Sequence, residues 1–359
     1  MKIGLLTTYS FNYGSYHQAV ALQKKLEDMG HECELINEKI KMFKWFNLFC
    51  MYTFNPILPK FIKDIIAKKI PQYNSFRMIE NDTKELTVSP ARIKKLDKLS
   101  KRYDCVIVGS DELWSANKDS IRFCPEYFGL GWNVPLVSYA TCAIKLTADD
   151  EVMNTKIREG LSKFTAVSVR DVKSYENVKA IKKDLCVETV IDPTLLNPYF
   201  VPENAETNDA DEKYVLLYGQ HYDEQQKKFI KNLAKKENAK IYCVGWEQTW
   251  TDKFVNVTSA KKLQETFSKA TFCFPSTFHG TIFSILNHKQ FVAMLNPLRG
   301  EKVKLLLELL RIEKSIYCPD SIDAEWINYE EVDNRLEDLR QCSECYLKDA
   351  LEEVAKSVK

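Results

Sequence analysis

The histidine best placed for chemistry, His279, lies in the apolar segment ATFCFPSTFHGTIFSIL at residues 270–286. The first five residues of this segment predict a short buried strand. Pro275 cannot continue a hydrogen-bonded ladder, and Ser276 and Thr277 are residue types that often begin a helix, so we expect the chain to turn here and enter an apolar helix. The turn between strand and helix is therefore a candidate site.

This predicted turn has the properties of an anion-binding site. His279 and Gly280 would lie in the first helical turn, where backbone N–H groups are unpaired and the helix dipole is positive. Such a position suits a phosphate or a carboxylate. The alternative, that His279 belongs to the start of an ordinary helix and does no chemistry, stays open from this segment alone.

Two further polar residues follow predicted strands. The apolar run at 104–109 is typical of a buried parallel strand, and it brings Asp111 to its carboxyl end. An aspartate there can orient or deprotonate a hydroxyl, or it can cap a turn or a helix. Arg170 ends the run at 166–170, where it can bind a carboxylate or phosphate at two points or pair with Asp171 on the surface.

Strand and helix patterns alternate in the N-terminal half in the order of a parallel sheet. An apolar strand at 2–7 is followed by a helical pattern at 15–29 and a second strand at 32–36. Ligands collect beyond the carboxyl ends of such strands, so the loop at 8–14 is a candidate wall of the site. This loop lacks the G-x-G-x-x-G pattern, so a bound dinucleotide is not supported.

The alternation restarts after a polar, acidic stretch at 201–212 that is typical of a linker. We therefore predict an α/β fold of two Rossmann-like domains facing a cleft, a frequent place for ligands. The expected parts are an N-terminal domain at 1–200 with an aromatic and lysine-rich insertion at 41–78, the linker, a C-terminal domain at 213–320 that carries His279, and C-terminal helices at 321–359. Within the C-terminal domain, strands are expected at 214–218, 240–244 and 291–295, and helices at 224–236 and 261–269.

The composition excludes several classes of function. The 51 basic residues are balanced by 50 acidic ones without a long basic block, which argues against nucleic acid as a partner. The 11 cysteines are odd in number and scattered, as expected for reduced thiols in the cytoplasm, and Cys342-x-x-Cys345 lacks a second ligand pair. The first apolar run is too short for a signal peptide, and no stretch reaches the roughly 20 apolar residues of a membrane span.

Six short motifs occur in an order that we associate with one family. They are Asn12-Tyr13-Gly14, Gln18-Ala19-x-x-Leu22-Gln23, Val108-Gly109-Ser110-Asp111-x-x-Trp114, Ser168-Val169-Arg170-Asp171, Asp192-Pro193-Thr194-Leu195-Leu196 and Phe278-His279-Gly280-Thr281-x-Phe283-Ser284. Each motif is weak alone, but together they look like the polysaccharide pyruvyl transferase family from the first strand to about residue 312.

The resemblance implies a fold similar to the GT-B glycosyltransferases. It also implies transfer of pyruvate from phosphoenolpyruvate onto two hydroxyls of a sugar, with formation of a ketal and release of phosphate, and no further cofactor or metal. The expected setting is capsule, exopolysaccharide or cell-wall assembly, with a sugar or lipid-linked oligosaccharide as acceptor. This chemistry requires an acid, a base, and cations for the carboxylate and the phosphate of the donor.

The candidate residues fall into three groups. The catalytic residues are His279 as acid and base and Asp111, which orients the acceptor hydroxyl; the donor contacts are Arg170, Thr277, Gly280, Thr281, Arg299, Lys302 and Lys304; the acceptor contacts are Asn12, Tyr13, Gly14, Ser110 and Trp114. One departure from the family pattern stands out, because many members carry an arginine two residues before the histidine, where this chain has a threonine. Nearby basic residues of the donor group are expected to compensate, although a lysine lacks the two-point geometry of arginine.

Two other functions remain open at this stage. The chain could be a GT-B-like glycosyltransferase that uses a nucleotide sugar, or a non-catalytic member of the family that binds a glycan or an assembly partner. A separate hypothesis concerns location: seven aromatic residues between 43 and 61 are flanked by lysines, a composition that suits the surface of an anionic membrane. We expect 41–73 either to dock peripherally on the cytoplasmic leaflet or to pack as a flap on the N-terminal domain.

Overall fold

The computed structural model describes residues 1–9, 13–37, 88–92, 96–116, 123–147, 149–203, 212–295, 300–319 and 327–358. Asn12, Arg299, the insertion at 41–78 and most of the expected linker lie outside these ranges. The expectations that concern them, including the membrane contact of 41–73, stay predictions. Within the described residues, no helix has both the length and the apolar character to cross a bilayer.

The N-terminal half contains a six-stranded parallel sheet in the order β3-β2-β1-β4-β5-β6. The strands are β1 (Lys2–Leu6), β2 (Glu32–Asn37), β3 (Val88–Arg92), β4 (Cys105–Val108), β5 (Leu136–Ser138) and β6 (Phe164–Ala166). Helix α1 (Tyr13–Asp28) connects β1 to β2, as the periodicity predicts. The central strands β1 and β4 pair in regular register, whereas the β2–β3 and β5–β6 pairings contain register shifts. Both faces of a parallel sheet are covered, which fits the continuous apolar runs of β1 and β4.

Shorter elements complete this half. They are α5 (Leu96–Ser100), the 3-10 turn η4 (Pro125–Phe128), α6 (Glu151–Leu161), the two-stranded parallel sheet of β7 (Ser168–Val169) and β8 (Glu188–Thr189), α7 (Val172–Ile181) between those two strands, and α8 (Pro193–Leu196). β7 ends directly before Arg170, so Arg170 lies at the carboxyl end of a strand. α7 and α8 both begin next to residues of the candidate site.

The C-terminal half contains a second parallel sheet in the order β11-β10-β9-β12. Its strands are β9 (Tyr214–Tyr218), β10 (Lys240–Val244), β11 (Lys253–Val255) and β12 (Phe272–Pro275), and its helices are α9 (Glu224–Lys236), α10 (Ala260–Ser268), α11 (Phe278–Leu286), α12 (Gly300–Leu309) and the 3-10 turn η5 (Glu313–Ser315). The predicted α/β fold with two parallel sheets is therefore confirmed. The exact domain boundaries stay predictions.

Two details of the C-terminal sheet differ from expectation. Pro275 is the last residue of β12 and lies opposite Tyr218, where its carbonyl accepts a bond from Met294 N at 2.8 Å. A proline is tolerated at this position because the ladder ends there and no further N–H is needed. The expected strand at 291–295 is reduced to isolated bridges from Phe291 and Ala293 to their neighbours.

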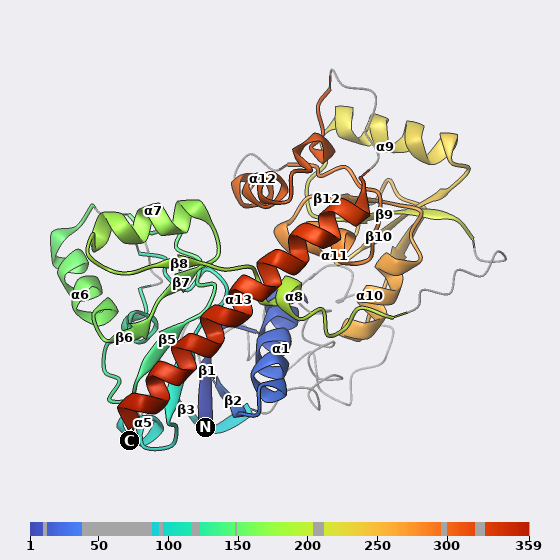
Figure 1. The fold of residues 1–359 in the computed structure, drawn as a ribbon. Coiled ribbons are helices and arrows are strands. Elements are labelled where there is room, and N and C mark those ends of the chain that lie inside the picture. Colours follow the sequence, from blue (N-terminus) through green and yellow to red (C-terminus); the bar gives the residue numbers. More distant parts are fainter. Residues whose placement is uncertain are drawn as a thin grey trace, which may run out of the picture.

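Helix α13 (Tyr329–Val358) joins the two halves. It begins beside the C-terminal sheet and runs diagonally back across the molecule to the N-terminal sheet (Figure 1). Arg340 Nε donates to Leu195 O at 2.8 Å, Ser343 Oγ accepts from Ile191 N at 3.1 Å, and Tyr346 Oη donates to Ser138 O at 2.7 Å. These bonds hold the helix against the segments that end next to the candidate site.

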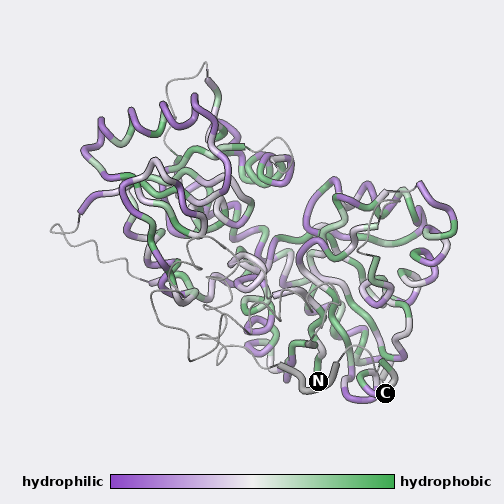
Figure 2. Tube along the Cα trace, turned by 180° about the vertical axis from the view of Figure 1, so that it is seen from behind, coloured by the Kyte–Doolittle hydropathy of each residue, from purple (hydrophilic) through white to green (hydrophobic). Residues whose placement is uncertain are grey.

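Hydrophobic residues concentrate along the inner strands, and hydrophilic residues follow the outer helices (Figure 2). The largest buried cluster includes residues of β1 and α1 together with residues of β9 and α11. One continuous apolar contact therefore crosses between the halves. At one end of this contact the carboxyl ends of both sheets bring the candidate polar residues together.

Candidate active site

Asp111 follows β4 and is held by groups of the N-terminal half. Its Oδ2 accepts bonds from Thr8 Oγ1 at 2.8 Å and Ser15 Oγ at 2.7 Å, and its Oδ1 accepts from Glu112 N at 2.8 Å. Burial favours a raised pKa for Asp111, but the bond from Ser15 and the nearby Arg170 guanidinium outweigh it and lower the pKa to about 2. Asp111 is therefore a fixed carboxylate that suits orienting a hydroxyl more than removing its proton.

Two expected acceptor contacts lie inside the N-terminal half. Ser110 is buried, and its Oγ donates to Gln18 Oε1 at 2.9 Å. Trp114 is fully buried against Phe128, with Nε1 bonded to Tyr127 O at 2.7 Å. The expected acceptor contact through Trp114 is not supported, because its large ring fills the core and its only polar atom is already paired.

The start of α1 contacts the helix that carries the histidine. Tyr13 is buried, with its ring centroid 6.4 Å from that of Tyr218 in the other half. Gly14 lies directly against the imidazole of His279, so a Cβ at position 14 would be 2.1 Å from Nδ1. Gly14 therefore limits where the histidine ring can lie, and the acceptor contact expected of Tyr13 and Gly14 stays a prediction.

Arg170 is buried and pairs with a residue that the sequence analysis did not select. Its Nη1 donates to Asp192 Oδ2 at 2.9 Å, and the side chains are 5% and 1% exposed. The guanidinium also lies over the ring of Phe278, 4.4 Å from the centroid. The alternative of a surface pair with Asp171 is wrong, because Asp171 caps α7 by accepting from Ser174 N at 2.7 Å.

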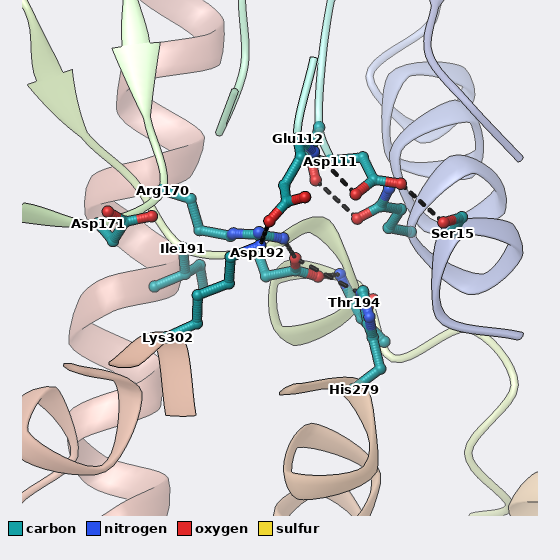
Figure 3. Close-up of polar contacts among 12 residues, drawn as sticks. Ser15, Asp111, Glu112, Arg170, Asp171, Ile191, Asp192, Thr194, His279 and Lys302 are labelled. Carbon is teal, nitrogen blue, oxygen red and sulfur yellow. Dashed lines mark hydrogen bonds and ion pairs between the residues drawn. The ribbon is translucent and has the colours of Figure 1, made fainter. Parts of the chain in front are cut away.

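His279, from α11, approaches the same carboxylate from the other half of the chain. Its Nε2 lies 3.8 Å from Asp192 Oδ2, and its side chain is 14% exposed. Figure 3 shows Arg170 and His279 on opposite sides of Asp192. Burial lowers the pKa of His279 below its ordinary value, with Arg170 adding to the effect and Asp192 opposing it.

Buried nitrogen atoms at this point lack a hydrogen bond. Within the part of the chain that the structure describes, Arg170 Nε and His279 Nε2 have no hydrogen-bond partner. A buried donor without an acceptor is costly, so such atoms commonly mark a place where a ligand binds. Both atoms could donate to an anion, provided that the imidazole carries its proton on Nε2.

The start of α11 only partly matches its expected role. Thr277 is the N-cap, as its residue type predicts, and its Oγ1 accepts from Gly280 N at 3.1 Å. Thr277 O accepts from Thr281 N at 3.0 Å and from Thr281 Oγ1 at 3.1 Å. The expectation of an unpaired N–H group at Gly280 is therefore wrong, because the Thr277 hydroxyl accepts from it.

Among the compensating cations that the structure describes, Lys302 lies near the site. Lys302 of α12 forms an ion pair with Glu112, which also pairs with Lys145 at 3.0 Å. Burial would raise the pKa of Glu112, but Lys302 and Lys145 lower it overall, so this contact joins the two halves as an ion pair. Lys304 is 60% exposed and pairs with Glu308 along its own helix at 3.6 Å, so its expected donor contact stays a prediction.

A second buried histidine was not foreseen. His17 of α1 bonds to Tyr13 O through Nδ1 at 2.6 Å, and its ring centroid is 4.6 Å from that of Phe283. Burial, with a further contribution from His279, lowers the pKa of His17 to about 3. His17 lies near the start of α1 on a buried, largely apolar face. A single histidine on such a face does not stand out in the sequence.

Groups of three or more His, Cys, Asp or Glu side chains arranged to hold a metal ion do not occur among the described residues. Cys342 and Cys345 are both exposed on α13.

Comparison with known proteins gives a family. The family model described as "Polysaccharide pyruvyl transferase" matches residues 12–297. No significant match is found among curated proteins. Similar solved structures include an alpha-glucosyltransferase in complex with UDP and DNA, at 10% identity and a TM-score of 0.49, covering 100% of this chain and 95% of that one. A UDP-GlcNAc 2-epimerase from Methanocaldococcus jannaschii matches at 10% identity and a TM-score of 0.44, covering 94% and 92%. At these identities and TM-scores the two structures say nothing about the substrate of this chain.

Proposed function

Because the chain belongs to the polysaccharide pyruvyl transferase family, we propose that it transfers the pyruvate unit of phosphoenolpyruvate onto two hydroxyls of a polysaccharide sugar. The family membership makes the chain a transferase with a polysaccharide acceptor. The donor, the ketal product and a lipid-linked acceptor are our proposals. These proposals go beyond the family assignment, because they name the residues of this chain that act in each step.

The observation that carries the proposal is the meeting of Arg170 and His279 at Asp192. The two side chains come from different halves, and each has a buried nitrogen without a hydrogen-bond partner in the described part of the chain. A guanidinium binds carboxylate or phosphate at two points, and a histidine beside it can transfer a proton. Phosphoenolpyruvate has both anionic groups and a carbon that must be protonated.

The proposed reaction begins with a proton transfer. Protonated His279 donates to the methylene carbon of phosphoenolpyruvate, which becomes a methyl group and leaves an oxocarbenium-like centre at the adjacent carbon. Arg170 holds the anionic end of the donor, and Lys302 supplies a further positive charge from α12. These cations stabilise the donor where a low dielectric makes each interaction strong.

Two attacks by sugar hydroxyls complete the ketal. The first hydroxyl adds to the oxocarbenium carbon and gives its proton to the now neutral His279, while Asp111 orients the hydroxyl. The carbon–oxygen bond to phosphate then breaks, and the second hydroxyl adds to the same carbon. The proton from that hydroxyl leaves with phosphate, so one substrate proton ends on the methyl carbon and the other on phosphate.

The acceptor is proposed to be carried on a membrane lipid on the cytoplasmic side. The aromatic and lysine-rich residues at 41–73 support this, since aromatic rings and lysines favour an anionic bilayer surface. Co-sedimentation with anionic liposomes that declines with salt is the expected behaviour. A Trp45→Ser/Phe46→Ser variant that stays folded and still sediments equally would remove this part of the proposal.

A direct test is phosphate release from phosphoenolpyruvate across a panel of lipid-linked sugars. The matching product should gain the mass of pyruvate less one water. Activity with nucleotide sugars instead, or release of phosphate without a modified sugar, would contradict the proposed reaction. Binding of a glycan without any turnover would support the non-catalytic alternative.

A further inference from the structure

Asp192 is the residue that connects the two candidate catalytic side chains. It precedes α8, and its Oδ1 caps that helix by accepting from Thr194 N at 2.9 Å. Its Oδ2 lies 2.9 Å from Arg170 Nη1 and 3.8 Å from His279 Nε2. One oxygen therefore serves the helix, and the other faces the site (Figure 3).

A buried carboxylate in this position controls the charge of its neighbours. A buried charge is tolerated only when it is paired, and Arg170 provides that pairing at rest. When His279 takes up a proton, a second positive charge appears beside a carboxylate that is already in place. The charged and titratable groups that act on His279 are the cations Arg170 and Lys302, the carboxylates Asp192 and Asp111, and the neighbouring His17.

We infer that Asp192 is a positioning residue of this site, whose carboxylate holds the Arg170 guanidinium in place and stabilises the protonated form of His279. It acts through these two residues and makes no contact with the reacting atoms. Without it, the protonated imidazole would face the positive charges of Arg170 and Lys302 with Asp111 alone to oppose them. The expected effect of Asp192 on turnover rests on the proposed function. The electrostatic link, by which the Asp192 carboxylate raises the pKa of His279, does not.

A neighbouring aspartate provides a matched control. Asp171 also caps a helix, through a bond from Ser174 N at 2.7 Å to its carboxylate, and it is adjacent to Arg170 in the chain. The structure records no contact between Asp171 and His279. An asparagine at either position keeps an oxygen for the cap and removes the charge, since Asp and Asn are similarly good N-caps.

The link can be measured without substrate. The chain has 5 histidines, so an NMR titration of the protein with labelled imidazole carbons gives few signals, and a His279→Asn sample assigns the one of interest. In Asp192→Asn the midpoint of His279 should move to lower pH by about one unit or more, the usual effect of removing an opposite charge at this distance. Asp171→Asn should leave the midpoint near its wild-type position. A folded Asp192→Asn protein with an unchanged midpoint would overturn the inference.

The Asp192→Asn variant could fail to fold because Arg170 would lose its partner. The Arg170→Met variant then provides a second test, in which the midpoint of His279 should move in the opposite direction. This change removes a positive neighbour of His279 and leaves the Asp192 carboxylate free to pair with the imidazole. The midpoint of His279 should rise. A fall or no change in a folded Arg170→Met protein would contradict the role of Asp192.

Kinetics then separate this inference from the proposed function. Where phosphoenolpyruvate is the donor, Asp192→Asn should lower kcat/KM at least tenfold at neutral pH and shift the pH profile in the direction of the NMR midpoint. A shifted NMR midpoint without turnover of phosphoenolpyruvate in the wild type would retain the link and reject the proposed function. Turnover of phosphoenolpyruvate together with an unshifted midpoint in Asp192→Asn would retain the proposed function and reject the electrostatic link.

Discussion

Two aspartates at the carboxyl ends of strands, Asp111 and Asp192, share a chemical type but differ in their surroundings. Asp111 accepts bonds from two hydroxyls and a backbone N–H, all from the N-terminal half. Asp192 accepts a cap bond with one oxygen, and its other oxygen lies between Arg170 and His279 from different halves. Both oxygens of the first carboxylate already accept hydrogen bonds, while the second carboxylate has neighbours that still lack partners.

The different surroundings of Asp111 and Asp192 suit the two ends of the site to different steps of the reaction. The Asp111 carboxylate has a lowered pKa and is held by three bonds, so it keeps its position and its charge. Its Oδ1 accepts a single bond and can still accept one from a bound hydroxyl. A carboxylate between an arginine and a histidine can respond to a proton or an anion, so this end suits donor chemistry. Substitutions at each end of the site test this difference between the two aspartates.

The largest effect is expected from His279→Asn. Loss of the proposed acid and base should lower turnover by roughly two to four orders of magnitude, while the melting temperature changes little. His288→Asn is the control, because this histidine is exposed at the other end of α11 and pairs with Asp333 at 3.1 Å. Turnover within a few-fold of wild type in the His279 variant would make this histidine structural.

Gly14→Ala should disturb the same histidine from the opposite side. The added Cβ would lie 2.1 Å from His279 Nδ1, so the ring must shift. A displacement of about 1 Å commonly reduces a rate by about a hundredfold, and we expect a loss of that order. Gly30→Ala serves for comparison, because nothing lies within 4 Å of that Cβ and its φ of +84° costs stability alone. Equal activity losses in both variants would contradict the contact with His279.

Arg170→Lys is expected to weaken donor binding by about ten- to a hundredfold, because the charge is kept but the two-point geometry is lost. Calorimetry with phosphoenolpyruvate measures the effect. Arg102→Lys is the matched control, since Arg102 forms a two-point pair with Glu34 away from the site, with Nε and Nη2 donating at 2.9 and 2.7 Å. Unchanged donor affinity in Arg170→Lys would assign the arginine to structure only.

Glu112→Gln is expected to have a smaller effect, about a few-fold. The change releases Lys302 from its ion pair, and a partly exposed pair contributes little to stability. Donor affinity should rise slightly as the lysine becomes free to bind an anion. A large loss of affinity would mean that Glu112 itself contacts the substrates.

The acid dependence of stability sharpens the contrast for Asp111. Its pKa is lowered from 3.8 to about 2 in the folded state, so its contribution is present above pH 4 and is lost as the pH falls toward 2. The shift corresponds to about 2 kcal/mol. Urea unfolding of Asp111→Asn should show a deficit of that order at pH 7 and a smaller deficit at pH 3. An equal deficit at both values would contradict the charge stabilisation.

Much of the fold could be predicted because its signals are local. The strands at 214–218 and 240–244 and the helix at 224–236 match their apolar patterns residue for residue. The short β6 and β7 and the bridges at Phe291 and Ala293 could not be predicted as such, because the number of ladder bonds depends on which neighbour is present. An apolar pattern therefore predicts that a helix or strand exists more reliably than it predicts its length.

The candidate site was predicted only where residue type and strand ends coincide. His279, Asp111 and Arg170 could be selected in this way. Asp192 was part of a motif without a chemical role, since its importance comes from Arg170 and His279, which are far from it in the chain. Trp114 was expected to contact the acceptor, and its burial could not be predicted because sequence does not show on which side of a sheet a loop residue packs.

An anionic donor is proposed to bind between Arg170 and His279. The most direct measurement follows the NMR signal of His279 while phosphoenolpyruvate is added to the full-length protein at neutral pH. Burial and Arg170 lower the pKa of the free imidazole, so it begins neutral. A donor dianion beside it should favour the charged form, and the account predicts that the signal moves to the protonated position at saturation. Saturating phosphoenolpyruvate that leaves the His279 signal unchanged would contradict the account.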